Sequence, residues 1–136
     1  MTASTDKLIP SGVQTDMIKI YSYEDSNLRG ALFNFNEGKA VNFQNLTQLL
    51  LEIDRFQERI AAGVPAWRDM KPDSLAEEGW FGGQKAIANF KLEILFTQNS
   101  TWQGQTLWLE TGKQTQFRSV LELVRLLNEA LEEKDA

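Results

Sequence analysis

WQGQTLWLETGKQTQFRSVLELVRLLNEAL, residues Trp102 to Leu131, is the stretch of sequence that predicts the fold of this chain. It begins with a strand, because Leu107 and Leu109 alternate with other residues at the period of a strand that buries one face. The dipeptide Gly112-Lys113 is typical of a hairpin turn, since glycine adopts the positive φ that tight turns require. A second strand then returns along the first, so this part of the chain predicts a β-hairpin.

A helix is expected directly after the hairpin. Ser119 and Glu122 form a capping-box pattern, in which each side chain can accept a hydrogen bond from the other residue's free backbone N–H. The helix should therefore begin at about Val120. Its apolar residues recur at the spacing of one helical face and are Val120, Leu123, Val124, Leu127, Ala130 and Leu131.

A faint copy of this stretch occurs earlier in the chain. LRGALFNFNEGKAVNFQNLTQLLLEIDRFQ, residues Leu28 to Gln57, superimposes on it without a gap at a constant offset of 74 (104 minus 30). The copy has its own capping-box pair, Asn45 and Gln48, and places Phe33 and Phe35 where the later stretch has its two strand leucines. Coincidence between two unrelated units is the alternative explanation, but the gapless register and the doubled capping box favour an internal duplication.

The remaining segments extend each copy to a β-β-β-α unit. Residues 1–16 are expected to form a flexible arm, 17–62 the first unit, 63–84 a crossover linker and 85–136 the second unit. Two alternating stretches, in MIKIYSY at the start of the first unit and in FKLEILF in the second, supply the additional strands. The chain should form one compact domain.

The predicted fold class is therefore α+β: two tandem pseudo-repeated β-β-β-α units, with antiparallel sheet or sheets and two helices packed on one side. Two questions stay open at this point. The strands can form one six-stranded sheet or two three-stranded sheets, and residues 63–84 can either cover the free face of the sheet or leave it open.

Cysteine and histidine are both absent from the 136 residues. This removes thiolate nucleophiles, imidazole acid–base catalysis and almost every zinc or iron site. We expect no catalytic residues, no metal and no cofactor, and so no enzyme. An enzyme that works with carboxylates alone remains an alternative, and it would need a buried aspartate or glutamate in a pocket.

Charge and hydropathy limit the partners. No segment approaches the roughly 20 apolar residues of a membrane span, and the N-terminal residues lack the apolar core of a signal peptide, so we expect a cytoplasmic protein without membrane contact. The net charge of −5 is spread along the chain. Direct binding of nucleic acid is therefore disfavoured, because it requires a basic surface.

The candidate binding residues are mainly aromatic. If the two leucines of the second hairpin face the helices, Trp108 faces away from them, on the same side as Tyr21, Tyr23, Leu32 and Leu95. Large exposed apolar patches on soluble domains usually contact another molecule. The alternative is that the linker or the N-terminal arm covers this face.

Two further residues complete the candidate set. Trp102 can cover the end of the core or present its ring to a partner. Arg118 precedes the N-cap of the second helix, where it can remain solvated or bind a carboxylate or phosphate beside the helix N-terminus. The equivalent residue in the first copy, Gln44, is uncharged.

The second half resembles a group of small, uncharacterised bacterial proteins. The resemblance covers about residues 86–131 and is carried by N-x-x-W-Q-G, W-L-E and F-R-S-x-L-E-L, here ending at Gly104, Glu110 and Leu123. The first half departs from these motifs. Such proteins are about as long as one half of this chain, so the resemblance implies that single units pair as dimers. It implies no activity.

The sequence thus favours a non-enzymatic intracellular module that presents an aromatic-bearing sheet face to a protein partner, as an accessory product of a mobile element. Self-association through the same face is also expected. The alternative is an acidic inhibitor from a phage or mobile element that blocks a nucleic-acid-handling enzyme. Carboxylates clustered on one surface would favour that alternative.

Overall fold

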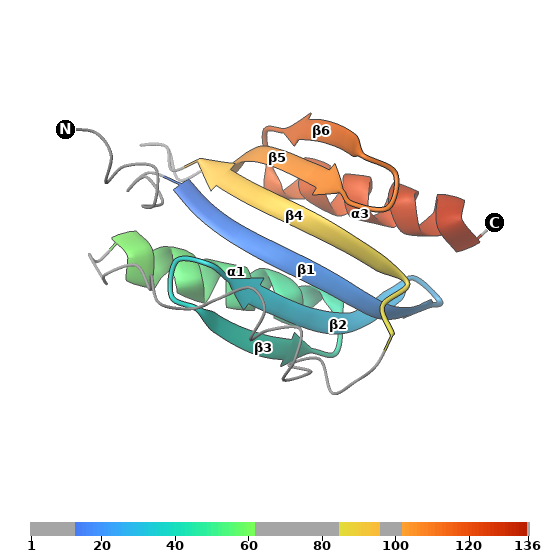
Figure 1. Cartoon of the computed structure of the whole chain (residues 1–136), viewed down its shortest axis with the longest axis horizontal. Coiled ribbons are helices and arrows are strands. Elements are labelled where there is room, and N and C mark those ends of the chain that lie inside the picture. The colour runs from blue at the N-terminus through green and yellow to red at the C-terminus, as the bar shows by residue number, and fades with distance from the viewer. Residues whose placement is uncertain (1–12, 62–84, 96–101, 136) are drawn as a thin grey trace.

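The computed structural model describes residues 13–61, 85–95 and 102–135. The predicted crossover linker 63–84 and the first twelve residues of the predicted arm lie outside these residues. The described part of the chain forms one layer of strands with helices packed against it (Figure 1).

All six strands belong to a single antiparallel sheet, in the order β3-β2-β1-β4-β5-β6. This decides between the one-sheet and two-sheet arrangements. The two halves meet where β1 pairs with β4, at the centre of the sheet. The strands are β1 (Val13–Glu24), β2 (Asn27–Asn34), β3 (Lys39–Phe43), β4 (Ala88–Leu95), β5 (Gln103–Trp108) and β6 (Lys113–Phe117).

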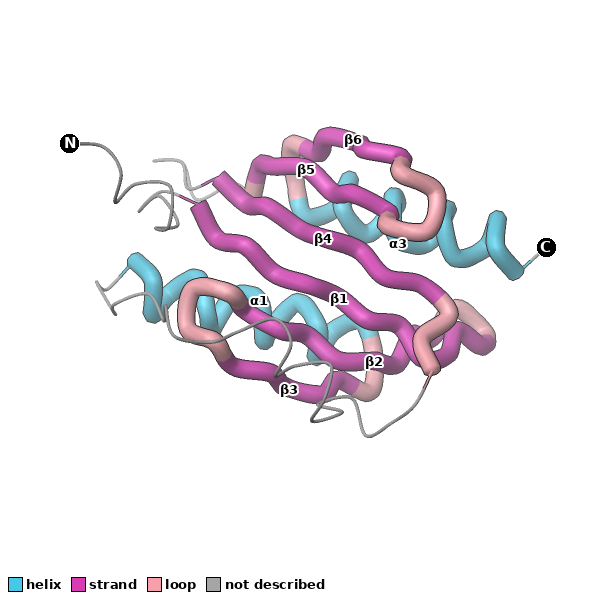
Figure 2. Tube along the Cα trace, in the orientation of Figure 1, coloured by secondary structure: helices cyan, strands magenta, loops and turns pink. Residues whose placement is uncertain are grey.

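Two helices, α1 (Leu46–Ala61) and α3 (Val120–Asp135), lie on the same side of the sheet, as predicted. Figure 2 shows both helices behind the strands, α1 across the half that contains β2 and β3 and α3 across the half that contains β5 and β6. The other side of the sheet carries no helix of the described residues, and we call it the open face.

Capping boxes begin both helices, as the sequence predicts. The backbone N–H of Glu122 donates to Ser119 Oγ over 3.1 Å, and that of Gln48 donates to Asn45 Oδ1 over 2.8 Å. The side chains of Glu122 and Gln48 were expected to accept a hydrogen bond from the backbone N–H of the N-cap residue, but they accept from the residue before it. Glu122 Oε1 accepts from the N–H of Arg118, and Gln48 Oε1 from the N–H that precedes Asn45. These bonds satisfy N–H groups at the helix N-termini.

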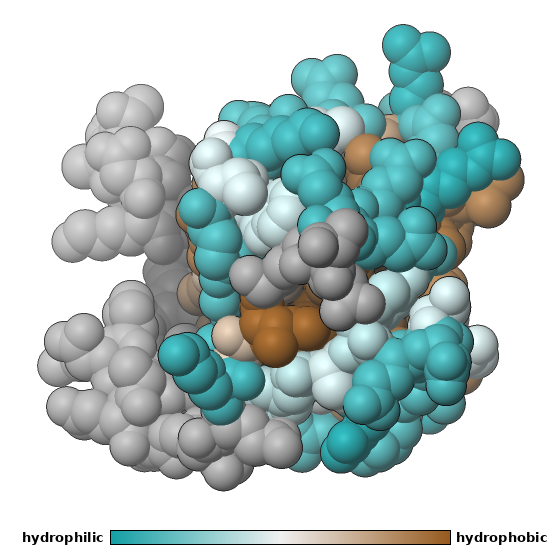
Figure 3. All heavy atoms as spheres, turned by 90° about the vertical axis from the view of Figure 1, so that its right-hand side faces the viewer, coloured by the Kyte–Doolittle hydropathy of each residue, from teal (hydrophilic) through white to brown (hydrophobic). Residues whose placement is uncertain are grey.

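The core lies between the sheet and the two helices. Every second residue of β4 is buried, from Ala88 to Ile94, and the equivalent side chains of β1 and β2 meet the apolar stripes of both helices. Seen from the end of the molecule that lies at the right of Figure 1, hydrophilic residues form most of the surface and a smaller apolar area lies among them (Figure 3).

The strand β1 begins at Val13, four residues before the predicted start at Met17. The predicted start at Met17 followed from the polar composition of residues 1–16, which include Gln14 and Asp16 and show no strand periodicity. Both side chains are nevertheless buried on the helix side. The predicted arm 1–16 thus contributes its last four residues to the central strand.

Glycine is required at Gly30 and Gly104, which stand opposite Phe43 and Phe117 in the neighbouring strands. A Cβ atom on Gly104 would lie 1.8 Å from the carbonyl oxygen of Glu93, and one on Gly30 would lie 1.8 Å from that of Lys19. No side chain fits at these distances. The facing phenylalanine is buried in each case, and such a ring replaces part of the packing that a glycine in a strand lacks.

Gly104→Ala should therefore destabilise the protein by about 3 kcal/mol or more, because the new methyl group overlaps the backbone of β4. Gly112→Ala is the matched control. Gly112 has a φ of +76° but nothing within 4 Å of the added Cβ, so its replacement should cost only about 1–2 kcal/mol of backbone strain. Urea unfolding measures both values. Equal losses for the two variants would contradict the close approach at Gly104.

Candidate functional site

Trp108 faces the helices, so the prediction that its side chain points away from them is wrong. It pairs with Phe90 of β4, stacks on that ring with centroids 5.9 Å apart, and is only 7% exposed. Leu107 consequently lies on the open face and Leu109 is exposed. The strand carries apolar residues on both faces, and burial of the large indole outweighs burial of the two leucines.

The two tyrosines also depart from the predicted aromatic face. The register of β1 and β2 shifts between Ile20 and Ser22, which makes Tyr21 the extra residue of a β-bulge. Beyond the bulge, Tyr23 pairs with Leu28 and packs against the core, and its hydroxyl lies 3.3 Å from Glu132 Oε2 on α3. Burial raises the pKa of Tyr21 to about 12.

The other members of that predicted face divide between the two sides. Trp102 is buried in the core cluster, which agrees with the alternative that it covers the core. Leu32 is also a core residue, contrary to prediction, whereas Leu95 lies on the open face and is 50% exposed. Phe33, predicted to face the helices, instead lies on the open-face side, where it is buried and contacts Phe35 edge to face.

The open face of β4, β5 and β6 is lined by amide and charged side chains instead of aromatic rings. Cross-strand pairing aligns Glu93 with Gln105 and Gln105 with Gln116. We call this surface the amide face, and its members are Lys91, Glu93, Leu95, Gln103, Gln105, Leu107, Gln114, Gln116 and Arg118.

A row of polar contacts orders the amide face across its three strands. Gln114 Nε2 donates to Gln105 Oε1 over 2.5 Å, and Gln105 Nε2 donates to Glu93 Oε1 over 2.6 Å. Lys91 Nζ lies 3.8 Å from the other oxygen of Glu93. The row holds these side chains in defined positions, which lowers the entropic cost of ordering them when a partner binds.

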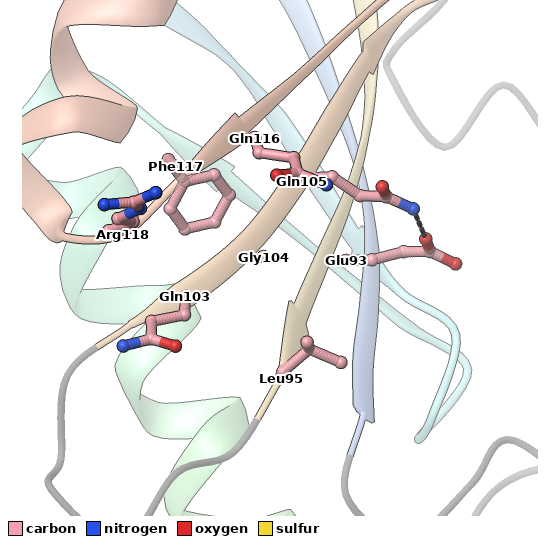
Figure 4. A pocket seen from close by; sticks show the side chains of 8 residues that line it. All are labelled: Glu93, Leu95, Gln103, Gly104, Gln105, Gln116, Phe117 and Arg118. Atoms are coloured by element: carbon pink, nitrogen blue, oxygen red, sulfur yellow. Dashed lines mark hydrogen bonds between the residues drawn. The ribbon is translucent and has the colours of Figure 1, made fainter.

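Beside this row lies a hollow of about 320 Å³. Figure 4 shows Arg118 and Gln103 on one side of the hollow and the bonded pair Gln105 and Glu93 on the other, with Gly104 between them. A smaller hollow of about 140 Å³ adjoins it over Lys91, Glu93 and Leu107. The larger one is lined by Glu93, Leu95, Gln103, Gly104, Gln105, Gln116, Phe117 and Arg118.

Arg118 is the one predicted site residue that lines this hollow. The glutamines were not identified, although the sequence contains a signal for them. Gln103 and Gln105 alternate in one strand of the hairpin, and Gln114 and Gln116 alternate in the other. Because period-two residues share a face, pairing of these two strands places all four amides on one side of the hairpin.

A second polar cluster is buried on the helix side around Asp16, which is fully buried. Its carboxylate accepts hydrogen bonds of 2.8 Å from Asn34 Nδ2 and from Gln14 Nε2. Gln14 Nε2 also lies 3.2 Å from the carbonyl oxygen of Ile53, so the cluster connects the sheet to α1. Nearby, Arg59 of α1 is paired with Glu37 at 2.7 Å.

Burial raises the pKa of Asp16 to about 7, although the two amide hydrogen bonds oppose the shift. A buried carboxyl with a raised pKa is the feature that a carboxylate-only enzyme would need. Asp16 lines neither hollow of the open face and lies on the opposite side of the sheet. Its observed contacts are those of a structural link between β1, β2 and α1.

The described residues contain no group of three or more acidic side chains that could hold a metal ion. Within the same residues, neither helix has the length and apolar character needed to cross a membrane. The expected cytoplasmic location and the absence of catalysis remain predictions.

Comparison with known proteins gave no match: no family model, no curated protein and no solved structure is significantly similar to this chain.

Trp108→Ala should cost about 3–5 kcal/mol of stability, because it removes a large ring from the core. Trp108→Phe is the control. It keeps a ring and removes an indole N–H that is buried without a hydrogen-bond partner among the described residues, so its loss should be smaller. Chemical unfolding distinguishes the two. A fully stable Trp108→Ala variant would contradict the core position.

Asp16→Asn should make stability less sensitive to pH between about 4 and 7. In this range the folded state keeps a proton on Asp16 that the unfolded state, with the ordinary pKa of 3.8, releases. Rising pH therefore destabilises the wild type, by up to about 4 kcal/mol from this group, and the effect levels off above pH 7.

The measurement is the difference in unfolding free energy between Asp16→Asn and the wild type, taken from urea titrations at several pH values. Because the other carboxylates are common to both proteins, the difference isolates Asp16. As the pH rises, the unfolding free energy of Asp16→Asn should increase relative to that of the wild type. A difference that is constant with pH would show that Asp16 titrates normally.

Proposed function

We propose that this protein is a non-catalytic protein-binding module and that its amide face holds the partner. The observation that carries the proposal is the ordered row of Lys91, Glu93, Gln105 and Gln114 beside a hollow, on a sheet face that no helix of the described residues covers. The predicted aromatic contact surface is thereby replaced by a polar one. Of the predicted binding residues, Arg118 is retained in this surface.

A protein segment suits this surface because glutamine amides both donate and accept hydrogen bonds, as the peptide backbone does. The two leucines, Leu95 and Leu107, add apolar contact area within the polar surface. β6 forms the outer strand of the described sheet next to this surface, where an extended segment can also pair with the backbone. Self-association through the same face stays a prediction.

We further propose that the chain is a tandem duplication of one β-β-β-α unit. The pairing of β1 with β4 supports this, because Met17 is opposite Lys91 and these two residues differ by the same offset of 74 (91 minus 17). A two-fold axis through this pair would exchange the halves. The two glycine–phenylalanine pairs and the two capping boxes occur at the same offset.

The two proposed units differ in the surface they present. The positions equivalent to Gln105 and Leu107 are Ala31 and Phe33, which are both buried. Where the second unit stacks Phe90 on Trp108, the first has the hydrogen-bonded pair Asp16 and Asn34. The second unit alone therefore supplies the amide face. In the single-unit proteins that this half resembles, pairing of two copies would provide the same sheet.

The acidic inhibitor is the second candidate, and one observation favours it. The exposed surfaces of the two helices carry more carboxylates than cations. The carboxylates are Asp54, Glu58, Glu122, Glu129, Glu132 and Glu133, and the cations are Arg55, Arg59 and Arg125. A basic surface on a nucleic-acid-handling enzyme would complement this helix layer.

Site-specific photo-crosslinking tests both candidates. The photoreactive residue para-benzoylphenylalanine replaces Gln114 on the amide face in one protein and Arg125 on the exposed side of α3 in another. Both positions are exposed, so both variants should fold. We expect the partner to be crosslinked in cells from position 114 and not from position 125.

Crosslinking from position 125 alone would support the acidic inhibitor and exclude the amide face. If neither position gives a protein adduct, both candidates are contradicted. Circular dichroism and urea unfolding of each variant establish that the fold is retained.

A further inference from the structure

The guanidinium group of Arg118 is exposed and makes no ion pair with any described residue. Its backbone N–H is occupied by Glu122, but the side chain extends beside the hollow of the amide face. By contrast, the carboxylate at the other side of the hollow, Glu93, is already bonded to Gln105 and near Lys91. The hollow therefore has two charged groups: the Glu93 carboxylate, which already has partners, and the Arg118 guanidinium, which has no ion-pair partner among the described residues.

Two amides next to Arg118 also have hydrogen-bonding capacity to spare. Gln103 and Gln116 make no side-chain hydrogen bond with described residues, although both line the hollow and are exposed. Leu95 and Phe117 supply apolar wall on the same hollow. A ligand with an anionic end and a short aliphatic stem would satisfy all of these groups.

The first half shows the same residue types in the opposite arrangement. Arg29 and Gln44 occupy the positions equivalent to Gln103 and Arg118 (29 plus 74, and 44 plus 74). There the arginine Nε donates to the glutamine Oε1 over 3.2 Å. The guanidinium of the first half is thus engaged within the protein, whereas that of Arg118 in the second half makes no hydrogen bond with a described residue.

We propose that the hollow binds the carboxylate of an acidic side chain in an extended segment of the partner protein, with Arg118 as the anion-binding residue. This inference rests on the proposed function of the amide face. The planar guanidinium can bind a carboxylate through two parallel hydrogen bonds. Gln103 and Gln116 donate from the sides, and the stem of the acidic residue lies against Leu95 and Phe117.

A carboxylate fits this site better than a phosphate. A phosphate monoester carries close to two negative charges at neutral pH, and one guanidinium would have to offset both. The chain has a net charge of −5, so the second negative charge of a phosphate would be repelled further. The same repulsion disfavours a polyphosphate backbone.

The test titrates the full, isotope-labelled chain with three capped tripeptides, acetyl-Thr-X-Thr-amide, in which X is glutamate, glutamine or phosphoserine. NMR shifts of the Arg118 Nε–H and of the side-chain amides of Gln103 and Gln116 are the readout. The glutamate peptide should shift these signals and bind at least about tenfold more tightly than the glutamine peptide.

Arg118→Gln, which introduces the residue found at the equivalent position 44, should lower the affinity for the glutamate peptide by about tenfold or more. Arg118→Lys should restore part of it, because the charge remains but the two-bond geometry is lost. Arg29→Gln is the matched control and should leave the affinity unchanged.

Equal binding of the glutamate and glutamine peptides would overturn the proposal, as would tighter binding of the phosphoserine peptide. No shift of the three reporter signals at glutamate peptide concentrations up to about 10 mM would also overturn it.

Crosslinking separates this inference from the proposed function. Arg118→Gln, added to the protein with the photoreactive residue at position 114, should reduce the yield of the partner adduct. An unchanged yield would reject the carboxylate site and leave the amide face as the binding surface. Absence of the adduct before Arg118 is changed would reject the amide face itself.

Discussion

The antiparallel pairing of β1 with β4 is the interaction on which the rest of the structure depends. It joins two three-stranded halves into one sheet, and places Ile18 opposite Phe90 on the helix side. Because both strands alternate buried and partly buried residues in register, one face of the sheet becomes mainly apolar, with the polar cluster around Asp16 at one end of β1. The two helices cover that surface, and the opposite face of β4 to β6 is left for polar residues.

On the helix side, residue pairs that lie 74 positions apart in the sequence are packed in two different ways. In one half, Asp16 and Asn34 are joined by a hydrogen bond and tied through Gln14 to the backbone of α1. In the other, Phe90 and Trp108, which lie 74 residues further along the chain, are joined by ring stacking. The polar pair is expected to make stability depend on pH, because burial leaves the charged carboxylate without solvating water and raises its pKa. The aromatic pair has no such dependence.

Much of the local structure was predictable because it depends on residues close in sequence. The capping pairs Ser119–Glu122 and Asn45–Gln48 begin helices where expected, and Gly112 has the positive φ of the predicted turn. The candidate site was predicted less well. Arg118 was identified, but the glutamines around it were not. The prediction turned Leu107 toward the helices, and Gln103 and Gln105 share a face of β5 with Leu107.

The amino-acid sequence by itself determined the elements, their order and the α+β class, because periodicity, capping and turn chemistry act within a few residues. Alternation also identified the buried faces of β1 and β4, but only the folded chain shows which face of β5 is buried. Leu107 and Trp108 are adjacent and both apolar, so alternation permits either to face the core. The aromatic Phe90 on β4, opposite Trp108, settles the choice by stacking with it. A bulge at Tyr21, set by the pairing of β1 with β2, likewise turned Tyr23 toward the helices.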